Sequence, residues 1–257
     1  MKNLVLLITK EWKESKKEYK ILWIPIVLIL AAIMQPLTMQ ILPKVVENND
    51  TFVVNPNYIT PSGNEVFSGI FGQLNQFAIF TIAVTTMGSI ISEKKSGVLE
   101  LLFSKPVTSL QYLLSKYIFY NILFIVSLFI GLFVGLYYTE VYYSSVSVSL
   151  FLKASLFYAI WLWFIVSLGV MGSAIFRNQI QAVLVIFTIP VLCLILNNFK
   201  GTFLEILNPG SLSKNAVSLM ANGSLIDYWY INILWVILLI ILCMYFSYKN
   251  LKITQKE

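Results

Sequence analysis

The sequence predicts an all-α integral membrane protein with six transmembrane helices. Apolar residues make up 58% of its 257 residues and charged residues only 12%, whereas a soluble domain carries about 25% charged residues. Apolar runs of about 20 residues, the length that crosses a hydrocarbon core of ~30 Å, recur along the chain. Lysines gather in the short segments between these runs, as a membrane topology requires.

The six predicted spans follow one another without an internal repeat, so residues 1–257 are predicted to form a single transmembrane domain. The fourth span is the longest, and the fifth is the shortest and contains Pro190. The predicted spans are residues 21–42, 71–91, 117–138, 150–176, 180–196 and 230–247.

The positions of Lys and Arg predict the orientation in the membrane. With the N-terminus inside, 14 of the 18 basic residues lie on the inner side, in residues 1–20, 92–116 and 248–257 and at Arg177. By the positive-inside rule, both termini are expected in the cytoplasm. A single arginine against 17 lysines is typical of AT-rich bacteria, so the predicted location is a bacterial cytoplasmic membrane.

Composition also excludes several classes of function. The net charge of +6 comes from separate clusters, so nucleic acid is not an expected partner. The chain has no histidine, and Cys193 and Cys243 lie inside apolar runs, which leaves no expected metal or catalytic site and little to support an intramembrane hydrolase. No Gly-x-x-x-x-Gly-Lys-Ser/Thr string occurs, so this chain is expected to bind no nucleotide or other cofactor itself.

Residues 1–20 predict an amphipathic helix that lies in the cytoplasmic membrane interface. Leu4, Ile8 and Trp12 recur at helical spacing, and most of the charged residues occupy other faces. Such a helix buries its apolar face in lipid and directs its lysines toward anionic headgroups. The alternative is a charged tail that only orients the first span.

Residues 92–108, between the second and third spans, predict a short helix at the membrane surface. Gly97 permits a sharp change of direction, and Val98, Leu101 and Leu102 are expected on one face of the helix that follows. Pro106 disfavours helix at the residue before it, so the helix must stop there. A short apolar helix of this kind suits a groove in a partner protein, but a loop whose leucines dip into lipid explains the pattern equally well.

The string EKKSGVLELLFSKPV at residues 93–107 resembles the signature that follows the second span in type-2 ATP-binding-cassette (ABC) export permeases. That signature runs Glu, basic residues, Gly, a small or apolar residue, Leu, an acidic residue, Leu-Leu and Pro-Val or Pro-Ile. The sequence departs from it at Val98, where Ser or Thr is commoner. The N-terminal helix, the six spans and an outer hairpin also match, so the resemblance covers essentially the whole chain.

This resemblance implies the membrane subunit of an exporter. Two permease copies, identical or merely similar, would pair and dock onto two separately made ABC ATPase subunits that bind ATP and Mg²⁺. The loop after the second span would be the coupling helix, and Glu93 would steady the turn that enters it. The residues expected at the ATPase contact are Glu93, Gly97, Val98, Leu99, Glu100, Leu101, Leu102 and Pro106.

Residues 197–229 predict an outer, extracellular hairpin between the fifth and sixth spans. Its two apolar patches are divided by Asn208-Pro209-Gly210, which favours a helix break. An exposed and a re-entrant course both remain open, and a re-entrant course is tolerated only where protein or water satisfies the backbone.

Three polar residues at the start of the second span are candidates for a cargo path, because polar side chains are costly in lipid. They are Gln73, Asn75 and Gln76, and in related permeases the second and fifth spans line the dimer interface. The alternative is hydrogen bonding between helices. No charged residue lies in the middle of a span, so the expected cargo is an amphipathic peptide or toxin, an antimicrobial or a lipid-like molecule. The alternative function is an ATP-independent secondary carrier or an immunity-type membrane protein.

Overall fold

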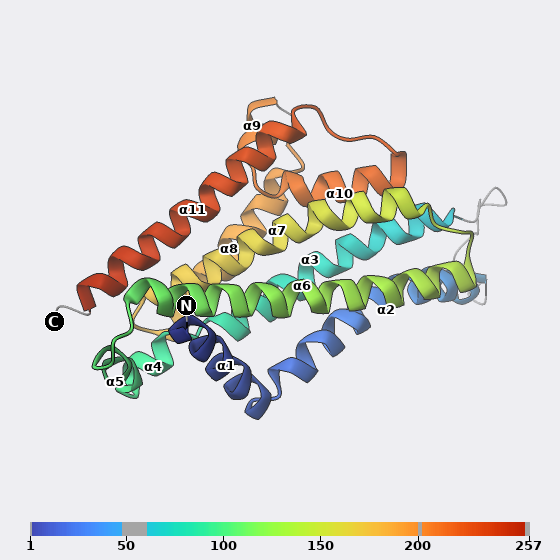
Figure 1. Cartoon of the computed structure of the whole chain (residues 1–257). Coiled ribbons are helices and arrows are strands. Elements are labelled where there is room, and N and C mark those ends of the chain that lie inside the picture. Colours follow the sequence, from blue (N-terminus) through green and yellow to red (C-terminus); the bar gives the residue numbers. More distant parts are fainter. Residues whose placement is uncertain (1, 48–60, 200–201, 255–257) are drawn as a thin grey trace.

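The computed structural model describes residues 2–47, 61–199 and 202–254, and in these ranges the chain forms helices and no strand. The all-α prediction is therefore confirmed (Figure 1). The helices are α1 Lys2–Lys17, α2 Lys20–Glu47, α3 Gly63–Thr86, α4 Ile91–Lys95, α5 Val98–Phe103, α6 Ser109–Tyr142, α7 Val148–Ile175, α8 Gln179–Leu196, α9 Thr202–Leu207, α10 Ser211–Asn222 and α11 Trp229–Thr254.

Six of these helices are long and apolar enough to cross a membrane, namely α2, α3, α6, α7, α8 and α11, which confirms the predicted number of spans. The helices of the second and third spans begin eight residues earlier in the chain than predicted. Helix α3 begins at Gly63 because Ser62 and Glu65 form a capping box, with Glu65 accepting from the Ser62 N–H at 2.9 Å. Helix α6 begins at Ser109 because Thr108 and Gln111 do the same. A capping box supplies partners for the free N–H groups of a first turn, so polar residues can begin a spanning helix.

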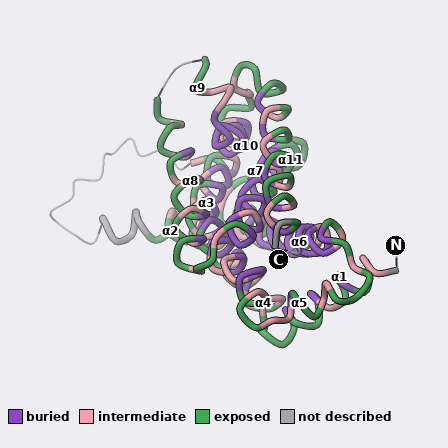
Figure 2. The backbone as a smooth tube through the Cα atoms, turned by 90° about the vertical axis from the view of Figure 1, so that its left-hand side faces the viewer, coloured by how far each residue is buried: buried purple, intermediate pink, exposed green. Residues whose placement is uncertain are grey.

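Helix α7 forms the centre of the bundle and contacts α3, α6, α8, α10 and α11. Figure 2 shows buried positions gathered along α6, α7 and α10, whereas α8 and α11 expose much of their surface. The most hydrophobic window of α7 is 72% buried, against 22% for α8. The outer helices therefore leave broad apolar faces for lipid or for another chain.

Small residues bring α6 close to α2. A Cβ atom added at Gly131 would lie 3.0 Å from the carbonyl oxygen of Leu28, and one at Gly135 would lie 3.3 Å from the Cβ of Ala32. Glycines four residues apart allow two helix backbones to approach in lipid, where the gain comes from van der Waals packing. This packing holds α6 against α2. The first turns of α6 contribute residues to the site described below.

The two ends of the bundle differ in their contents. The first turn of α1, the short helices α4 and α5 and the C-terminal end of α11 lie together at one end, called here the α5 end (Figure 1). The α6–α7 turn and the start of α3 lie at the other end. Both described ends of the chain are thus on one side, as an even number of spans requires.

The predicted helix break at Asn208-Pro209-Gly210 is present between α9 and α10. Asparagine side chains satisfy backbone carbonyls at the break and at the end of α8. Asn197 donates to the Gly210 carbonyl at 2.9 Å, Asn232 to the Asn208 carbonyl at 2.9 Å, and Asn208 to the Cys193 carbonyl of α8 at 2.8 Å. Helix α10 packs against α7 and α3. The hairpin therefore meets its backbone hydrogen bonds from within the protein, which is the condition for irregular backbone at membrane depth.

Candidate functional site

The loop at the α5 end makes two turns between α3 and α6. Helix α3 ends at Thr86, α4 follows as a single short helix, and Gly97 then adopts a φ of 74° before α5 begins. This left-handed conformation costs an ordinary L-residue roughly 1–2 kcal/mol. The change of direction predicted at Gly97 is therefore present, and it explains why glycine occupies that position.

The corner between α3 and α4 is held by one serine of α7. The Ser173 hydroxyl accepts from the backbone N–H groups of Ile90 at 2.8 Å and Ile91 at 3.3 Å, and it donates to the Met87 carbonyl at 3.1 Å. Ser173 is fully buried. Backbone groups left unpaired by the end of α3 thus find partners inside the bundle, and the direction in which α4 leaves it is fixed.

Helix α5 packs on the bundle with one face and presents the other outward. Leu99 is only 2% exposed and Leu102 packs against the core, whereas Leu101 is 69% exposed and Glu100 is exposed beside it. Val98, Leu101 and Leu102, predicted on one face, differ in exposure, because the bundle takes up Leu102 while Leu101 points outward. Leu99 was expected at a partner contact, but its burial gives it the role of anchoring α5.

Helix α1 packs against α6 along a stripe beside the apolar face that was predicted to enter lipid. Leu7, Glu11 and Ser15, spaced by four residues, are its buried positions. The predicted residues Leu4 and Ile8 are half-buried beside this stripe, and Trp12 is half-exposed. Trp12 also contacts the Phe119 ring of α6 edge-on, with centroids 6.1 Å apart. The membrane contact of α1 stays a prediction.

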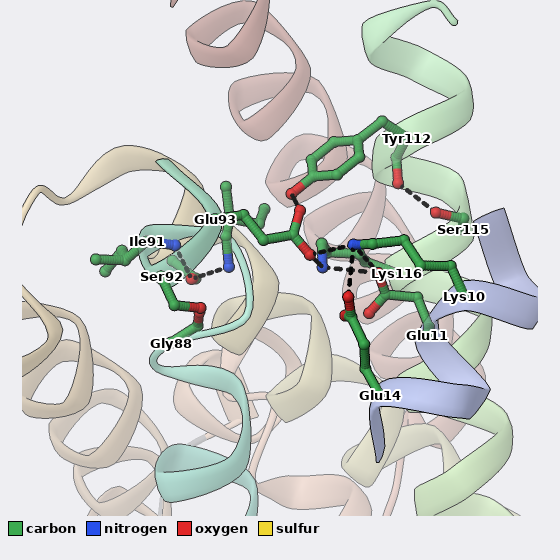
Figure 3. Close-up of polar contacts among 12 residues, drawn as sticks. Lys10, Glu11, Glu14, Gly88, Ile91, Ser92, Glu93, Tyr112, Ser115 and Lys116 are labelled. Atoms are coloured by element: carbon green, nitrogen blue, oxygen red, sulfur yellow. Dashed lines mark hydrogen bonds and ion pairs between the residues drawn. The ribbon is translucent and has the colours of Figure 1, made fainter. Parts of the chain in front are cut away.

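A buried cluster of charges joins α1, α4 and α6 (Figure 3). Lys116 of α6 donates to Glu11 at 2.8 Å and to Glu93 at 2.7 Å, and its side chain is 1% exposed. Lys10 donates to Glu93 at 2.6 Å, and the Tyr112 hydroxyl donates to the second oxygen of Glu93 at 2.7 Å. Glu93, expected to steady the turn into the coupling helix, thus binds the loop to two other helices.

Sequence reasoning missed Lys116 and Glu11. Lys116 was counted among the loop lysines because the third span was taken to start at residue 117, whereas α6 begins at Ser109. A charge is costly to bury unless it is paired. The one available signal was the spacing of Leu7, Glu11 and Ser15, which places a carboxylate on a stripe that α1 buries.

The carboxylates near Lys116 do not make a metal site. Oxygens of Glu11, Glu14 and Glu93 lie within 4.8 Å of one another, but the Lys10 ammonium contacts all of them, at 3.6, 3.2 and 2.6 Å. Lys116 contacts Glu11 and Glu93 as well. Lysine charges thus occupy the positions from which a cation would be bound, and the cluster is an ion-pair network.

The structure does not bring the three predicted cargo-path residues together. Gln73 donates to Gln35 of α2 at 3.4 Å. Asn75 donates to Ser213 of α10 at 2.7 Å and accepts from the indole N–H of Trp161 at 3.2 Å. Gln76 alone is exposed. The first two therefore join helices, and a cargo contact stays a prediction.

Six spanning helices, an amphipathic N-terminal helix and a short helical loop at one end define a polytopic helical membrane protein. The chain belongs to the ABC-2 transporter family, since the family model described as "ABC-2 family transporter protein" matches residues 5–251. It is 32% identical over 180 residues to the uncharacterized transmembrane protein YxlG of Bacillus subtilis (strain 168), covering 69% of this chain and 70% of that protein. The chain is thus a multi-pass permease subunit of an ABC transporter, in a family whose members associate with an ABC ATPase subunit.

Proposed function

We propose that this chain is the permease of an ABC exporter and that α5 is its coupling helix. The observation that carries the proposal is the exposed pair of Glu100 and Leu101 on a helix anchored to the bundle by Leu99. A short helix with one anchored face and one outward apolar side chain suits insertion into a partner's groove. Two copies of a separately made ATPase, which bind ATP and Mg²⁺, would receive this face.

The orientation follows from the proposed docking. The α5 end holds the start of α1, the end of α11 and most of the basic residues that the structure describes. The positive-inside rule puts these segments in the cytoplasm, where an ATPase meets ATP. Both termini are then cytoplasmic, and the hairpin of α9 and α10 belongs to the outer half of the protein.

A second permease copy fits the open face formed by α2, α3 and α8. Helix α3 contacts both α2 and α8, and Gly72, Gln76 and Phe80 form an exposed stripe along it. A Cβ atom at Gly72 would meet nothing within 4 Å. We propose that the partner, identical or similar, covers this face and that Gln76 points toward the translocation path.

The proposed cargo is an amphipathic peptide or toxin, an antimicrobial or a lipid-like molecule. The exposed stripe on α3 offers an amide beside apolar side chains and carries no charge. Such a surface binds by shape and apolar contact with few polar anchors. A proton- or ion-coupled carrier would instead need an ionisable group in the middle of a span, whereas Lys116 lies near the start of α6 and is held in ion pairs.

Purification of the complex tests the coupling assignment. The chain is co-expressed with the ATPase encoded nearest its gene, isolated through a tag on the permease and weighed by native mass spectrometry. We expect two ATPase and two permease subunits, and we expect Leu101→Asp to lose the ATPase. The matched control is Leu6→Asp, because Leu6 is 67% exposed on α1 and Leu101 is 69% exposed on α5.

Either of two results would overturn the proposal. If Leu6→Asp and Leu101→Asp lose the ATPase equally, α5 is not the specific contact. If a folded wild-type chain retains no ATPase, the chain acts without one, and an ATP-independent carrier or an immunity-type membrane protein becomes the better explanation.

A further inference from the structure

We propose that Lys116 is a positioning residue for energy coupling. Its buried ammonium joins α1 to the coupling loop (residues 92–108), so that helix and loop move as one body with the start of α6. The inference rests on the proposed function, because it takes α5 as the element that the ATPase moves. It assigns to Lys116 and Glu11 a task for which neither residue was a candidate from sequence.

Helix α1 contacts the coupling loop both where the loop leaves α3 and where it enters α6. Near the entry, Lys10 donates to Glu93 at 2.6 Å. At the exit, the Asn3 amide donates to the Pro106 carbonyl at 2.9 Å. Lys10 and Asn3 are seven residues apart, or about 10 Å along a helix. Helix α1 therefore spans the base of the loop that carries α5.

Lys116 determines the register of this arrangement. It contacts Glu11 of α1 and Glu93 of α4 at 2.8 and 2.7 Å, and its side chain is 1% exposed while those of the two acids are 5% and 10% exposed. A shift of α1 by one residue would leave these charges buried and separated, which is strongly unfavourable. Buried ionic groups are best attested in this use, the selection of one register over others.

The apolar contacts of α1 do not impose the same register. Leu7 is buried against the bundle and Trp12 packs edge-on against Phe119. Apolar contacts are non-directional, so α1 can slide or rotate slightly while it keeps most of this burial. The directional bonds of α1, from Lys10 and Asn3 to the loop and from Glu11 to Lys116, are therefore what make α1 follow the loop, and the bond to Lys116 ties both to α6.

The loop also has a fixed corner about which it can turn. Ser173 of α7 holds the backbone at Met87, Ile90 and Ile91, where α4 leaves α3. Force applied to α5 then acts on α4 beyond this corner and reaches α6 through Glu93 and Lys116. In this way a displacement of α5 is transmitted to the third span, α6, as well as to the second, α3.

Electron–electron distance measurements on the complex with its ATPase test the proposal without knowledge of the cargo. Spin labels are placed at exposed positions by Lys13→Cys on α1, Ser104→Cys after α5 and Val148→Cys at the far end. Cys193 and Cys243 are first replaced by alanine, and an excess of unlabelled permease leaves one labelled copy in each complex. Distances are compared between the nucleotide-free and the ATP-vanadate-trapped states.

We expect the distance between positions 13 and 104 to stay constant while the distance between positions 104 and 148 shifts. In Glu11→Leu/Lys116→Met, the distribution between 13 and 104 should broaden and shift with nucleotide. The matched control, Glu205→Leu/Lys214→Met, removes by the same substitutions the ion pair at 3.3 Å between α9 and α10, and it should leave that distribution unchanged. Glu11→Gln serves where the double variant fails to assemble, because glutamine keeps an acceptor for Lys116, and it should broaden the distribution less.

The outcomes separate this inference from the proposed function. A wild-type chain that binds no ATPase contradicts the function itself. A complex that forms, but whose 13–104 distance changes as much as its 104–148 distance, contradicts the single moving body, as does a complex in which neither distance changes. An unchanged 13–104 distribution in Glu11→Leu/Lys116→Met, or in Glu11→Gln where that variant stands in, contradicts the role of Lys116.

Discussion

Lys116 and Glu93 are 23 residues apart in the chain, yet the ammonium of one lies 2.7 Å from the carboxylate of the other in the interior of the protein. The lysine belongs to the third span and the glutamate to the short helix that leads into the coupling loop. Their contact connects the part of the chain that crosses the membrane with the part proposed to meet the ATPase.

Replacing one charged residue of this cluster should lower the free energy of unfolding more than replacing an oppositely charged pair. Lys116→Met leaves two buried carboxylates with one partner fewer, so we expect a loss of about 3–5 kcal/mol in the free energy of unfolding. Glu11→Leu/Lys116→Met should be near neutral, because Glu93 keeps Lys10 and Tyr112. Denaturant unfolding in detergent measures both, with the exposed Lys95→Met as control. Equal losses in the single and double variants would show that Glu11 and Lys116 do not act as a pair.

Alanine should have opposite effects on stability at two glycines where a side chain would meet no other atom of the chain. Gly97 has a φ of 74° and Gly72 lies in the middle of α3, and an added Cβ meets nothing within 4 Å at either position. Gly97→Ala should destabilise by about 1 kcal/mol, because only the backbone conformation opposes it. In the separated permease monomer, Gly72→Ala should stabilise by up to about 1 kcal/mol through helix propensity. The melting temperatures of the two variants should therefore move in opposite directions, and a common direction would contradict this explanation.

Asn208 should be essential to the hairpin of α9 and α10. Its amide donates to the Cys193 carbonyl and to Asn197, and its oxygen accepts from the Gly210 N–H at 3.0 Å. Asn208→Ala leaves these buried groups without partners, at roughly 1–3 kcal/mol for each unsatisfied group. The exposed neighbour Asn198→Ala is the control and should change stability little. Limited proteolysis of the hairpin measures the difference, and equal cleavage of both variants would contradict the prediction.

Labelling in intact cells should report the orientation. A membrane-impermeant maleimide is expected to modify Gly223→Cys and Val148→Cys, at the far side of the bundle, and to modify Lys13→Cys and Lys252→Cys only after the cells are opened. The reason is the excess of lysines at the α5 end. The opposite pattern would put α5 outside the cell, where no ATP-dependent partner can reach it.

Much of the fold was predictable from residue types alone. Six apolar runs separated by charged segments specify six spanning helices, since a chain in lipid must satisfy its backbone within each segment. The turn at Gly97 and the break at Asn208-Pro209-Gly210 were also predictable, because they depend on local conformational preference. These features need no knowledge of what packs against them.

The site depended on contacts between distant segments, which residue types do not reveal. Whether Leu99 or Leu101 faces the bundle depends on how α5 packs against it after the turn at Gly97. Whether Gln73 and Asn75 are free or bonded depends on Gln35 and Ser213, in other helices.

Composition and charge distribution by themselves thus determined that the chain spans a membrane six times and which segments share one side of it. Only the tertiary structure decided that Lys116 is buried and that Glu11 and Glu93 are its partners. The physical reason is that hydropathy is a sum over neighbours in the chain, whereas a buried charge is stable only through partners that folding brings to it.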